Sequence, residues 1–249
     1  MGSPPAPAPG PRNEQSIDHL IVALDFPSAS QAFELVSRLE GSVRWFKVGL
    51  ELYLAAGAKV VIELKRLGYS VFLDLKLHDI PNTVAGAVRS ASAVGADLLT
   101  VHAAGGPAML RAAAEAASAI EAAPRLVAVT VLTSMDAGEL AAIGITASPA
   151  AQVARLASLA VASGCAGLVC SPQEVRSLRN ALPAETLLVT PGIRPTGAEI
   201  GDQKRVATPA AALRAGASFL VVGRPIHAAA DPRAAAEAIL LEMRPAGDE

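Results

Sequence analysis

The sequence is poor in aromatic residues and in long apolar runs, and it carries no large excess of charge of either sign. Aromatic side chains make up 3% of the 249 residues. Apolar runs such as residues 20–24 are far shorter than the roughly 20 residues that a membrane span needs. Lysine and arginine number 21 against 23 aspartates and glutamates, a net charge of -2. We therefore expect a soluble protein that binds neither nucleic acid nor a membrane.

Cysteine is also scarce, and the two that occur predict no covalent cross-link. Cys165 and Cys170 are an odd number of positions apart, so on an extended strand they would point to opposite faces. Two cysteines alone do not make a metal site. We expect two small buried thiols in a reducing cytoplasm.

The first 15 residues are rich in proline and glycine, and they have neither a basic start nor an apolar stretch. This composition predicts a flexible tail and not a secretory signal. No composition break or linker follows it. We expect residues 16–249 to form a single domain, which is within the usual size of one α/β domain.

Short apolar runs alternate with longer segments rich in alanine and leucine, about eight times. We expect strands at 19–25, 43–48, 70–76, 97–102, 125–133, 166–171, 186–192 and 218–224, and helices at segments such as 28–40, 80–95, 105–123, 148–164 and 171–182. Eight strand–helix units favour an α/β fold of the (β/α)8 TIM barrel type over a doubly wound sheet with about six.

Polar side chains stand at the carboxyl end of nearly every predicted strand. They are Asp25, Lys47, Asp74, Lys76, His102, Thr133, Ser171, Arg194 and Arg224. Barrel enzymes build their active sites at these strand ends. We therefore expect a shared pocket at one mouth of the barrel.

The densest charge lies in and after the third predicted strand. Asp74 and Lys76 are two apart and should project to the same side, while Asp79 follows in the loop that opens the next helix. Lys47 on the neighbouring strand completes a set of two ammoniums and two carboxylates. An ion-pair cluster that only ties strand ends together is the alternative. Burying ions costs several kcal/mol each, which favours a functional role.

The last two predicted strands are followed by signals of a phosphate site. Gly223 would let a ligand approach the backbone, and Arg224 and Arg194 supply planar forks of donors. Loops after strands seven and eight commonly hold a phosphate in this fold, and the irregular stretch 192–208 is long enough to suggest a function. Either arginine could instead pair with a surface carboxylate.

A metal site is not expected, although His78 and His102 lie near the same mouth. Neither histidine belongs to an H-x-H or H-x-x-x-H pattern, and the neighbouring lysines would repel a cation.

The stretch FLDLKLHDIPNTV at residues 72–84 resembles the D-x-K-x-x-D-I-P-N-T signature of the orotidine 5'-monophosphate decarboxylase family. Five further stretches occur in the order that this family shows: LIVALDFP, FKVGLELY, VTVLTSM, VTPGIRP and VVGRPI. The resemblance runs from about Asp18 to the last helix.

The resemblance implies decarboxylation of orotidylate to uridylate without a cofactor and without a metal. Lys76 would protonate C6 of the pyrimidine. Asp74 and Asp79 would flank the reacting carboxylate and hold Lys76, while Lys47 would complete the charge network.

The resemblance also implies the substrate contacts and the assembly. Asp25 and Lys47 would meet the ribose, and Thr133 the pyrimidine amide. The remaining substrate-binding positions are Ile80, Pro81, Asn82, Thr83, Pro191, Arg194, Gln203, Gly223 and Arg224, of which Arg194, Gln203, Gly223 and Arg224 would surround the phosphate. Asp79 and Thr83 would reach into the neighbouring subunit's site, which implies a homodimer. Its expected location is the cytoplasm, as for the two cysteines.

Two other functions fit parts of the pattern. A magnesium-dependent sugar-phosphate decarboxylase or aldolase would share Asp74 and Lys76, but Lys47 stands where an acidic metal ligand would be more useful. A catalytically silent barrel that binds a nucleotide or a protein partner would be expected to have lost one of the four charged residues, and all four are present.

Overall fold

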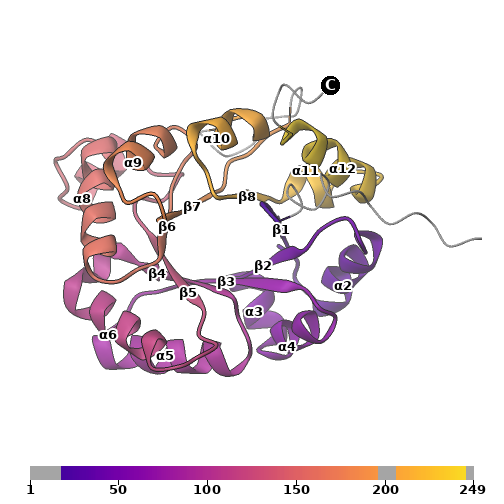
Figure 1. Cartoon of the computed structure of the whole chain (residues 1–249), viewed down its shortest axis with the longest axis horizontal. Coiled ribbons are helices and arrows are strands. Elements are labelled where there is room, and N and C mark those ends of the chain that lie inside the picture. Colours follow the sequence, from indigo (N-terminus) through magenta and orange to yellow (C-terminus); the bar gives the residue numbers. More distant parts are fainter. Residues whose placement is uncertain (1–17, 196–205, 245–249) are drawn as a thin grey trace, which may run out of the picture.

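The computed structural model describes residues 18–195 and 206–244. Its parallel strands close into a barrel in which neighbours in sequence pair with one another and β8 pairs with β1, as Figure 1 shows along the barrel axis. The strands are β1 (Leu20–Ala23), β2 (Trp45–Gly49), β3 (Ser70–Leu77), β4 (Leu98–His102), β5 (Arg125–Val129), β6 (Gly167–Val169), β7 (Leu187–Thr190) and β8 (Phe219–Val222). The predicted (β/α)8 TIM barrel is confirmed.

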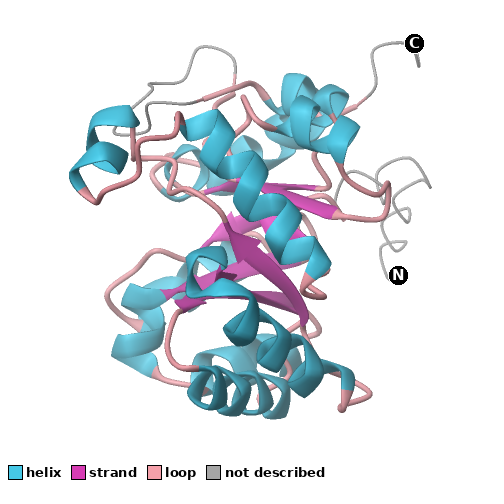
Figure 2. Ribbon diagram, turned by 90° about the vertical axis from the view of Figure 1, so that its left-hand side faces the viewer, coloured by secondary structure: helices cyan, strands magenta, loops and turns pink. Residues whose placement is uncertain are grey.

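Helices surround the strands on the outside of the barrel (Figure 2). They are α2 (Ala29–Arg38), α3 (Leu50–Ala56), α4 (Lys59–Arg66), α5 (Pro81–Ala93), α6 (Gly106–Ser118), α7 (Ala137–Ala142), α8 (Pro149–Ala162), α9 (Val175–Ala181), α10 (Pro209–Ala215), α11 (Arg224–His227) and α12 (Pro232–Glu242), with a 3-10 turn at Ala103–Gly105. Ser28 and Ser148 cap α2 and α8 by accepting hydrogen bonds from backbone N–H groups of the first turn.

Side chains of the strands alternate between the barrel interior and the helix layer. On β3, Phe72 faces the interior with Trp45 and Phe219, whereas Val71 and Leu73 pack with the helices. Trp45 and Phe219 meet edge to face with ring centroids 5.1 Å apart. These apolar side chains fill the interior, so polar inward-facing residues are left for the carboxyl ends of the strands.

One strand departs from regular pairing. On β3, Leu73 pairs with Leu99 of β4, but Leu77 pairs with Val101, so the register shifts between these two positions. Within the shifted stretch Lys76 has a φ of 51°, in the left-handed region that non-glycine residues seldom adopt. The irregularity falls on the charged segment that the sequence singled out.

Both cysteines are buried and free, as predicted. Burial raises the pKa of each thiol to about 12.

No helix in the described part of the chain is long and apolar enough to cross a membrane. The predicted tail at residues 1–15 and the predicted phosphate ligand Gln203 lie outside the described residues.

Candidate active site

Two adjoining cavities open at the carboxyl ends of the strands. The first, here called the β3–β5 cavity, has a volume of about 170 Å³ and is lined by Lys47, Phe72, Asp74, Lys76, Val129, Val131, Leu132, Thr133, Val169, Pro191 and Val221. The second, here called the β1–β8 cavity, has a volume of about 520 Å³ and is lined by Ala23, Asp25, Lys47, Pro191, Arg194, Val221, Gly223, Arg224 and His227. Lys47, Pro191 and Val221 belong to both, so the mouth of the barrel forms one continuous site.

A chain of ion pairs links the two cavities. The Lys47 ammonium lies 2.8 Å from Oδ1 of Asp25 and 3.7 Å from Oδ2 of Asp74. The Lys76 ammonium lies 2.9 Å from Oδ1 of Asp74. The side chains of Lys47 and Asp74 are only 12% and 13% exposed, so bulk water screens their charges weakly. The predicted grouping of Asp74, Lys76 and Lys47 is confirmed.

Asp79 does not join this chain of ion pairs within one subunit. Its carboxylate is exposed and accepts a hydrogen bond from the Ile80 backbone N–H at 2.6 Å. Among the described residues it forms no ion pair with either lysine. The four-membered network expected from sequence is therefore incomplete in the single chain.

The residues that follow Asp79 are exposed as well. Ile80 precedes α5 and is 68% exposed, while Pro81, Asn82 and Thr83 form the first turn of that helix. None of the four lines either cavity. The segment from Asp79 to Thr83 is therefore on the surface of the single chain, outside both cavities.

Two residues that the sequence did not single out support the ion pairs. Thr100 on β4 is fully buried, and its hydroxyl donates to Oδ1 of Asp74 at 3.1 Å. Gly49 ends β2, and a Cβ there would lie 2.9 Å from the Lys47 Nζ and 3.4 Å from Oδ1 of Asp25. The glycine therefore leaves room for the bond between Lys47 and Asp25.

Positive charge gathers on the other side of the mouth. Arg194 is only 8% exposed, and its guanidinium donates to the Ile193 carbonyl at 2.9 Å. Burial and the nearby guanidinium of Arg224 lower the pKa of Arg194. Burial also lowers the pKa of His227, with Asp25 opposing that shift and Arg224 adding to it. An anion bound in the β1–β8 cavity would relieve the repulsion between the two arginines.

Two of the predicted strand-end residues lie elsewhere. His102 lines neither cavity and stacks on His78, with ring centroids 5.3 Å apart. Ser171 is fully buried and also lines neither. Thr133, Pro191 and Gly223 do line the mouth, as predicted.

Across residues 18–195 and 206–244, no group of three or more His, Cys, Asp or Glu side chains could hold a metal ion.

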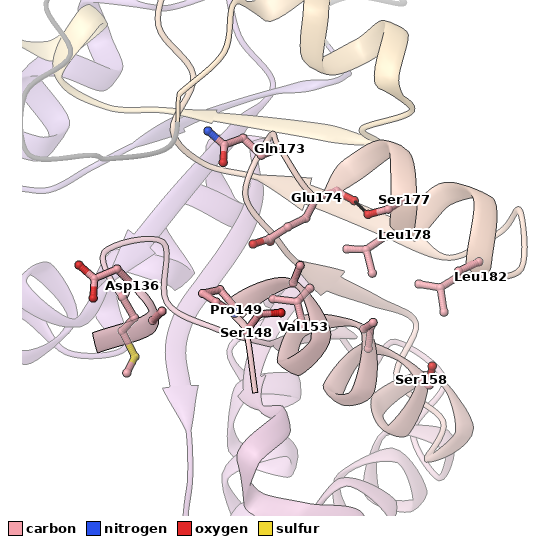
Figure 3. A pocket seen from close by; sticks show the side chains of 16 residues that line it. Asp136, Ser148, Pro149, Val153, Ser158, Gln173, Glu174, Ser177, Leu178 and Leu182 are labelled. Carbon is pink, nitrogen blue, oxygen red and sulfur yellow. Dashed lines mark hydrogen bonds between the residues drawn. The ribbon is translucent and has the colours of Figure 1, made fainter. Parts of the chain in front are cut away.

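A third cavity lies between α8 and α9, outside the barrel (Figure 3). Its volume is about 510 Å³, and most of its wall is apolar, with Val153, Leu178 and Leu182 among the lining residues. Its two carboxylates serve local structure, because Asp136 caps α7 and Glu174 accepts from the Ser171 backbone N–H at 2.8 Å. Reactive side chains therefore converge at the mouth and not in this groove.

Comparison with known proteins gives a consistent result. The sequence profile of the "Orotidine 5'-phosphate decarboxylase / HUMPS family" matches residues 18–239. A protein of Halorhodospira halophila named orotidine 5'-phosphate decarboxylase is 54% identical over 228 residues, which cover 92% of this chain and 97% of that protein. One of the same name from Anaeromyxobacter dehalogenans is 55% identical over 222 residues, covering 89% and 96%.

Solved structures show the same similarity. The crystal structure of orotidine 5'-phosphate decarboxylase from Lactobacillus acidophilus has a TM-score of 0.82 and 40% identity, covering 92% of this chain and all of that one. The structure of the enzyme of the same name from Pyrococcus horikoshii has a TM-score of 0.74 and 27% identity, covering 91% and 99%.

Proposed function

The chain belongs to the orotidine 5'-phosphate decarboxylase / HUMPS family, and on this premise we propose that Lys76 protonates C6 of the pyrimidine during decarboxylation of orotidine 5'-monophosphate to uridine 5'-monophosphate. The reaction needs neither metal nor cofactor. The observation that carries the proposal is the 2.9 Å ion pair between Lys76 and Asp74 at the wall of the β3–β5 cavity.

The chemistry explains why a site for this reaction concentrates charge. The bond between C6 and the carboxylate carbon breaks, its electron pair stays on C6, and carbon dioxide leaves. That electron pair is not delocalised into a conjugated sink, so the site must stabilise it electrostatically. The Lys76 ammonium would first stabilise the negative charge that develops on C6, and would then donate the proton that forms the C6–H bond. The neutral amine regains a proton from water.

Preorganisation of the ammonium supports this role. Lys76 is tethered by Asp74, and Asp74 lies in turn within 3.7 Å of Lys47. A charge held in position before the reaction needs no reorganisation when the carbanion forms. We attribute the rate enhancement to this stabilisation of the transition state, and not to repulsion between Asp74 and the substrate carboxylate.

Lys47 also argues against the magnesium-dependent alternative. Its ammonium lies between Asp25 and Asp74, the two carboxylates that a cation at this mouth would need. A bound lysine and a divalent cation would compete for the same oxygens. This favours an organic substrate with hydroxyl groups, and Asp25 with Lys47 would hold its ribose.

The rest of the substrate would occupy the two cavities. Thr133 would hydrogen-bond the pyrimidine amide in the β3–β5 cavity, beside Pro191. Arg194, Gly223 and Arg224 would surround the phosphate in the β1–β8 cavity, as expected after strands seven and eight of this fold. Gln203 would reach the same phosphate from the segment outside the described residues.

We further propose a cytoplasmic homodimer with two composite sites, its catalytic domain running from residue 16 onward. What supports the composite sites is that Asp79 is exposed and makes no ion pair with Lys47 or Lys76 among the described residues of its own chain, so a neighbouring subunit can reach it. Asp79 and Thr83 of one subunit would complete the other subunit's charge network. Ile80, Pro81 and Asn82 would line the junction.

The test is to follow the ultraviolet absorbance of orotidylate mixed with purified protein in excess chelator, with Lys76→Ala alongside. We expect rapid loss of the orotidylate signal with the wild type and none with the variant, which should still bind uridylate. Turnover by Lys76→Ala would refute the donor role. Loss of wild-type activity on chelation would revive the magnesium-dependent alternative, and an inactive wild type without chelator would refute the proposed reaction.

A further inference from the structure

We infer that Thr100, on β4, is a positioning residue that holds Asp74 and Lys76 in their reactive arrangement. The inference rests on the proposed role of Lys76 as proton donor. It arises from the irregular pairing of β3 with β4 and from two hydrogen bonds of one buried hydroxyl.

The register shift places Thr100 opposite the charged segment. Leu73 pairs with Leu99 and Leu77 pairs with Val101. Three β3 residues, from Asp74 to Lys76, therefore face a single β4 residue, Thr100. Extra residues on one strand leave some backbone groups without their usual partner in the ladder.

Thr100 supplies the missing partner. Its hydroxyl oxygen accepts a hydrogen bond from the Lys76 backbone N–H at 2.7 Å. Lys76 is the sole non-glycine residue with a positive φ in the described part of the chain. Such a conformation persists only where the surrounding structure enforces it, and this short bond is one such constraint.

The same hydroxyl also orients Asp74. A backbone N–H can only donate, so the Thr100 oxygen must accept from Lys76, and its own proton is then directed to Oδ1 of Asp74 at 3.1 Å. The Lys76 ammonium donates to that same oxygen at 2.9 Å. Lys76 is thereby held at its backbone and at its ammonium, through one hydroxyl and one carboxylate.

This arrangement sets the direction in which each Asp74 oxygen points. Oδ1 receives Thr100 and Lys76, while Oδ2 is left facing Lys47 at 3.7 Å. Loss of the hydroxyl would free the carboxylate to rotate and the Lys76 backbone to relax. Small displacements of a reacting group lower the rate of the chemical step more than they lower binding.

The experiment compares Thr100→Val, which removes the hydroxyl at nearly constant volume, with Thr100→Ser, which keeps it. The matched control is Thr130→Val, because Thr130 is also buried but its hydroxyl donates to the Val169 carbonyl at 3.3 Å. For each protein kcat and KM are measured with orotidylate, and the dissociation constant with uridylate. Thermal denaturation reports folding.

We expect Thr100→Val to lower kcat about tenfold to 100-fold while KM and uridylate affinity change little. Thr100→Ser should keep a kcat close to that of the wild type, and Thr130→Val should not differ from it. A buried hydroxyl that served stability alone would lower the melting temperature without changing kcat of the folded enzyme.

A Thr100→Val variant with the kcat of the wild type would overturn the inference. So would a Thr100→Ser variant whose kcat falls as far as that of Thr100→Val. If Thr100→Val does not fold, the smaller Thr100→Ala takes its place in the comparison with Thr100→Ser. Failure of the proposed function is distinguishable, because it would appear as an inactive wild type or an active Lys76→Ala, whichever residue stands at position 100.

Discussion

The Lys47 ammonium donates a hydrogen bond to the Asp25 carboxylate at 2.8 Å, and this bond joins the two cavities of the barrel mouth. The lysine side chain is 12% exposed, whereas that of Asp25 is 49% exposed. Lys47 thus extends from the protected charge network to the open side of the site. A ligand in the β1–β8 cavity would be connected through it to the ion pair of Lys76 with Asp74.

Gly49 should prove necessary for this bond. Its φ of -93° suits any residue, so Gly49→Ala would introduce no backbone strain, but the new Cβ would lie 2.9 Å from the Lys47 Nζ. We expect displacement of the ammonium to lower kcat/KM about tenfold or more, with little change in melting temperature. Steady-state kinetics and thermal denaturation measure the two effects.

Gly86→Ala is the matched control for Gly49→Ala. A Cβ at Gly86 would meet only the Arg89 side chain at 3.7 Å, and alanine is favoured over glycine within a helix by about 1 kcal/mol. Activity should remain at the wild-type level. Unchanged kinetics in Gly49→Ala itself would show that the space beside Lys47 is not needed.

Arg224→Ala should affect the natural substrate selectively. Loss of a charge-assisted hydrogen bond to the phosphate should raise the barrier by about 2 kcal/mol or more, which is roughly 30-fold in kcat/KM. Orotidine, which lacks the phosphate, should be turned over equally by the variant and the wild type. The exposed Arg214 at the end of α10 offers a control. Arg214→Ala should leave kcat/KM unchanged for both orotidylate and orotidine. Equal losses on orotidylate and orotidine would contradict a phosphate contact.

Two inactive variants should complement each other if the sites are composite. In a heterodimer of Lys76→Ala with Asp79→Ala, one site would contain both mutations and the other neither. Random mixing makes half of the dimers heterodimers, so we expect recovery of about a quarter of wild-type activity in a two-fold symmetric dimer. The assay is decarboxylation after co-refolding or subunit exchange. Absence of any recovery would place Asp79 in the same subunit's site.

Folding stability should fall in mild acid through His102. Burial, His78 and Lys76 lower the pKa of His102 below its usual value of 6.5. The unfolded chain therefore binds a proton at a pH where the folded chain does not, and the free energy of unfolding decreases as pH falls below about 6.5. Denaturant titrations between about pH 7 and 5 measure this slope.

His102→Phe should show a shallower decrease of that free energy over the same range. Phenylalanine keeps an aromatic ring against His78 and carries no titrating nitrogen, and it removes a buried Nδ1 that has no hydrogen-bond partner among the described residues. An identical slope in the variant and the wild type would exclude His102 as the source.

Several features of the mouth were predictable because strands have a period of two. Asp74 and Lys76 share a side, and Lys47 on the neighbouring strand meets them. The strand-end pattern also predicted that His102 and Ser171 belong to the shared pocket, and this was wrong, because they line neither cavity. A sequence shows that a polar residue ends a strand, but not how high the neighbouring strands reach or which way its side chain points.

The sequence by itself determined the barrel and the identity of its charged residues, because the alternation of apolar runs and the motifs at the strand ends are local properties of the chain. Only the tertiary structure decided that Asp79 stays away from Lys76 within one subunit, and that Thr100 faces the irregular segment of β3. Thr100 resembles any threonine in an apolar strand. Its role depends on the register between two strands separated by a helix, and register arises only when the barrel closes.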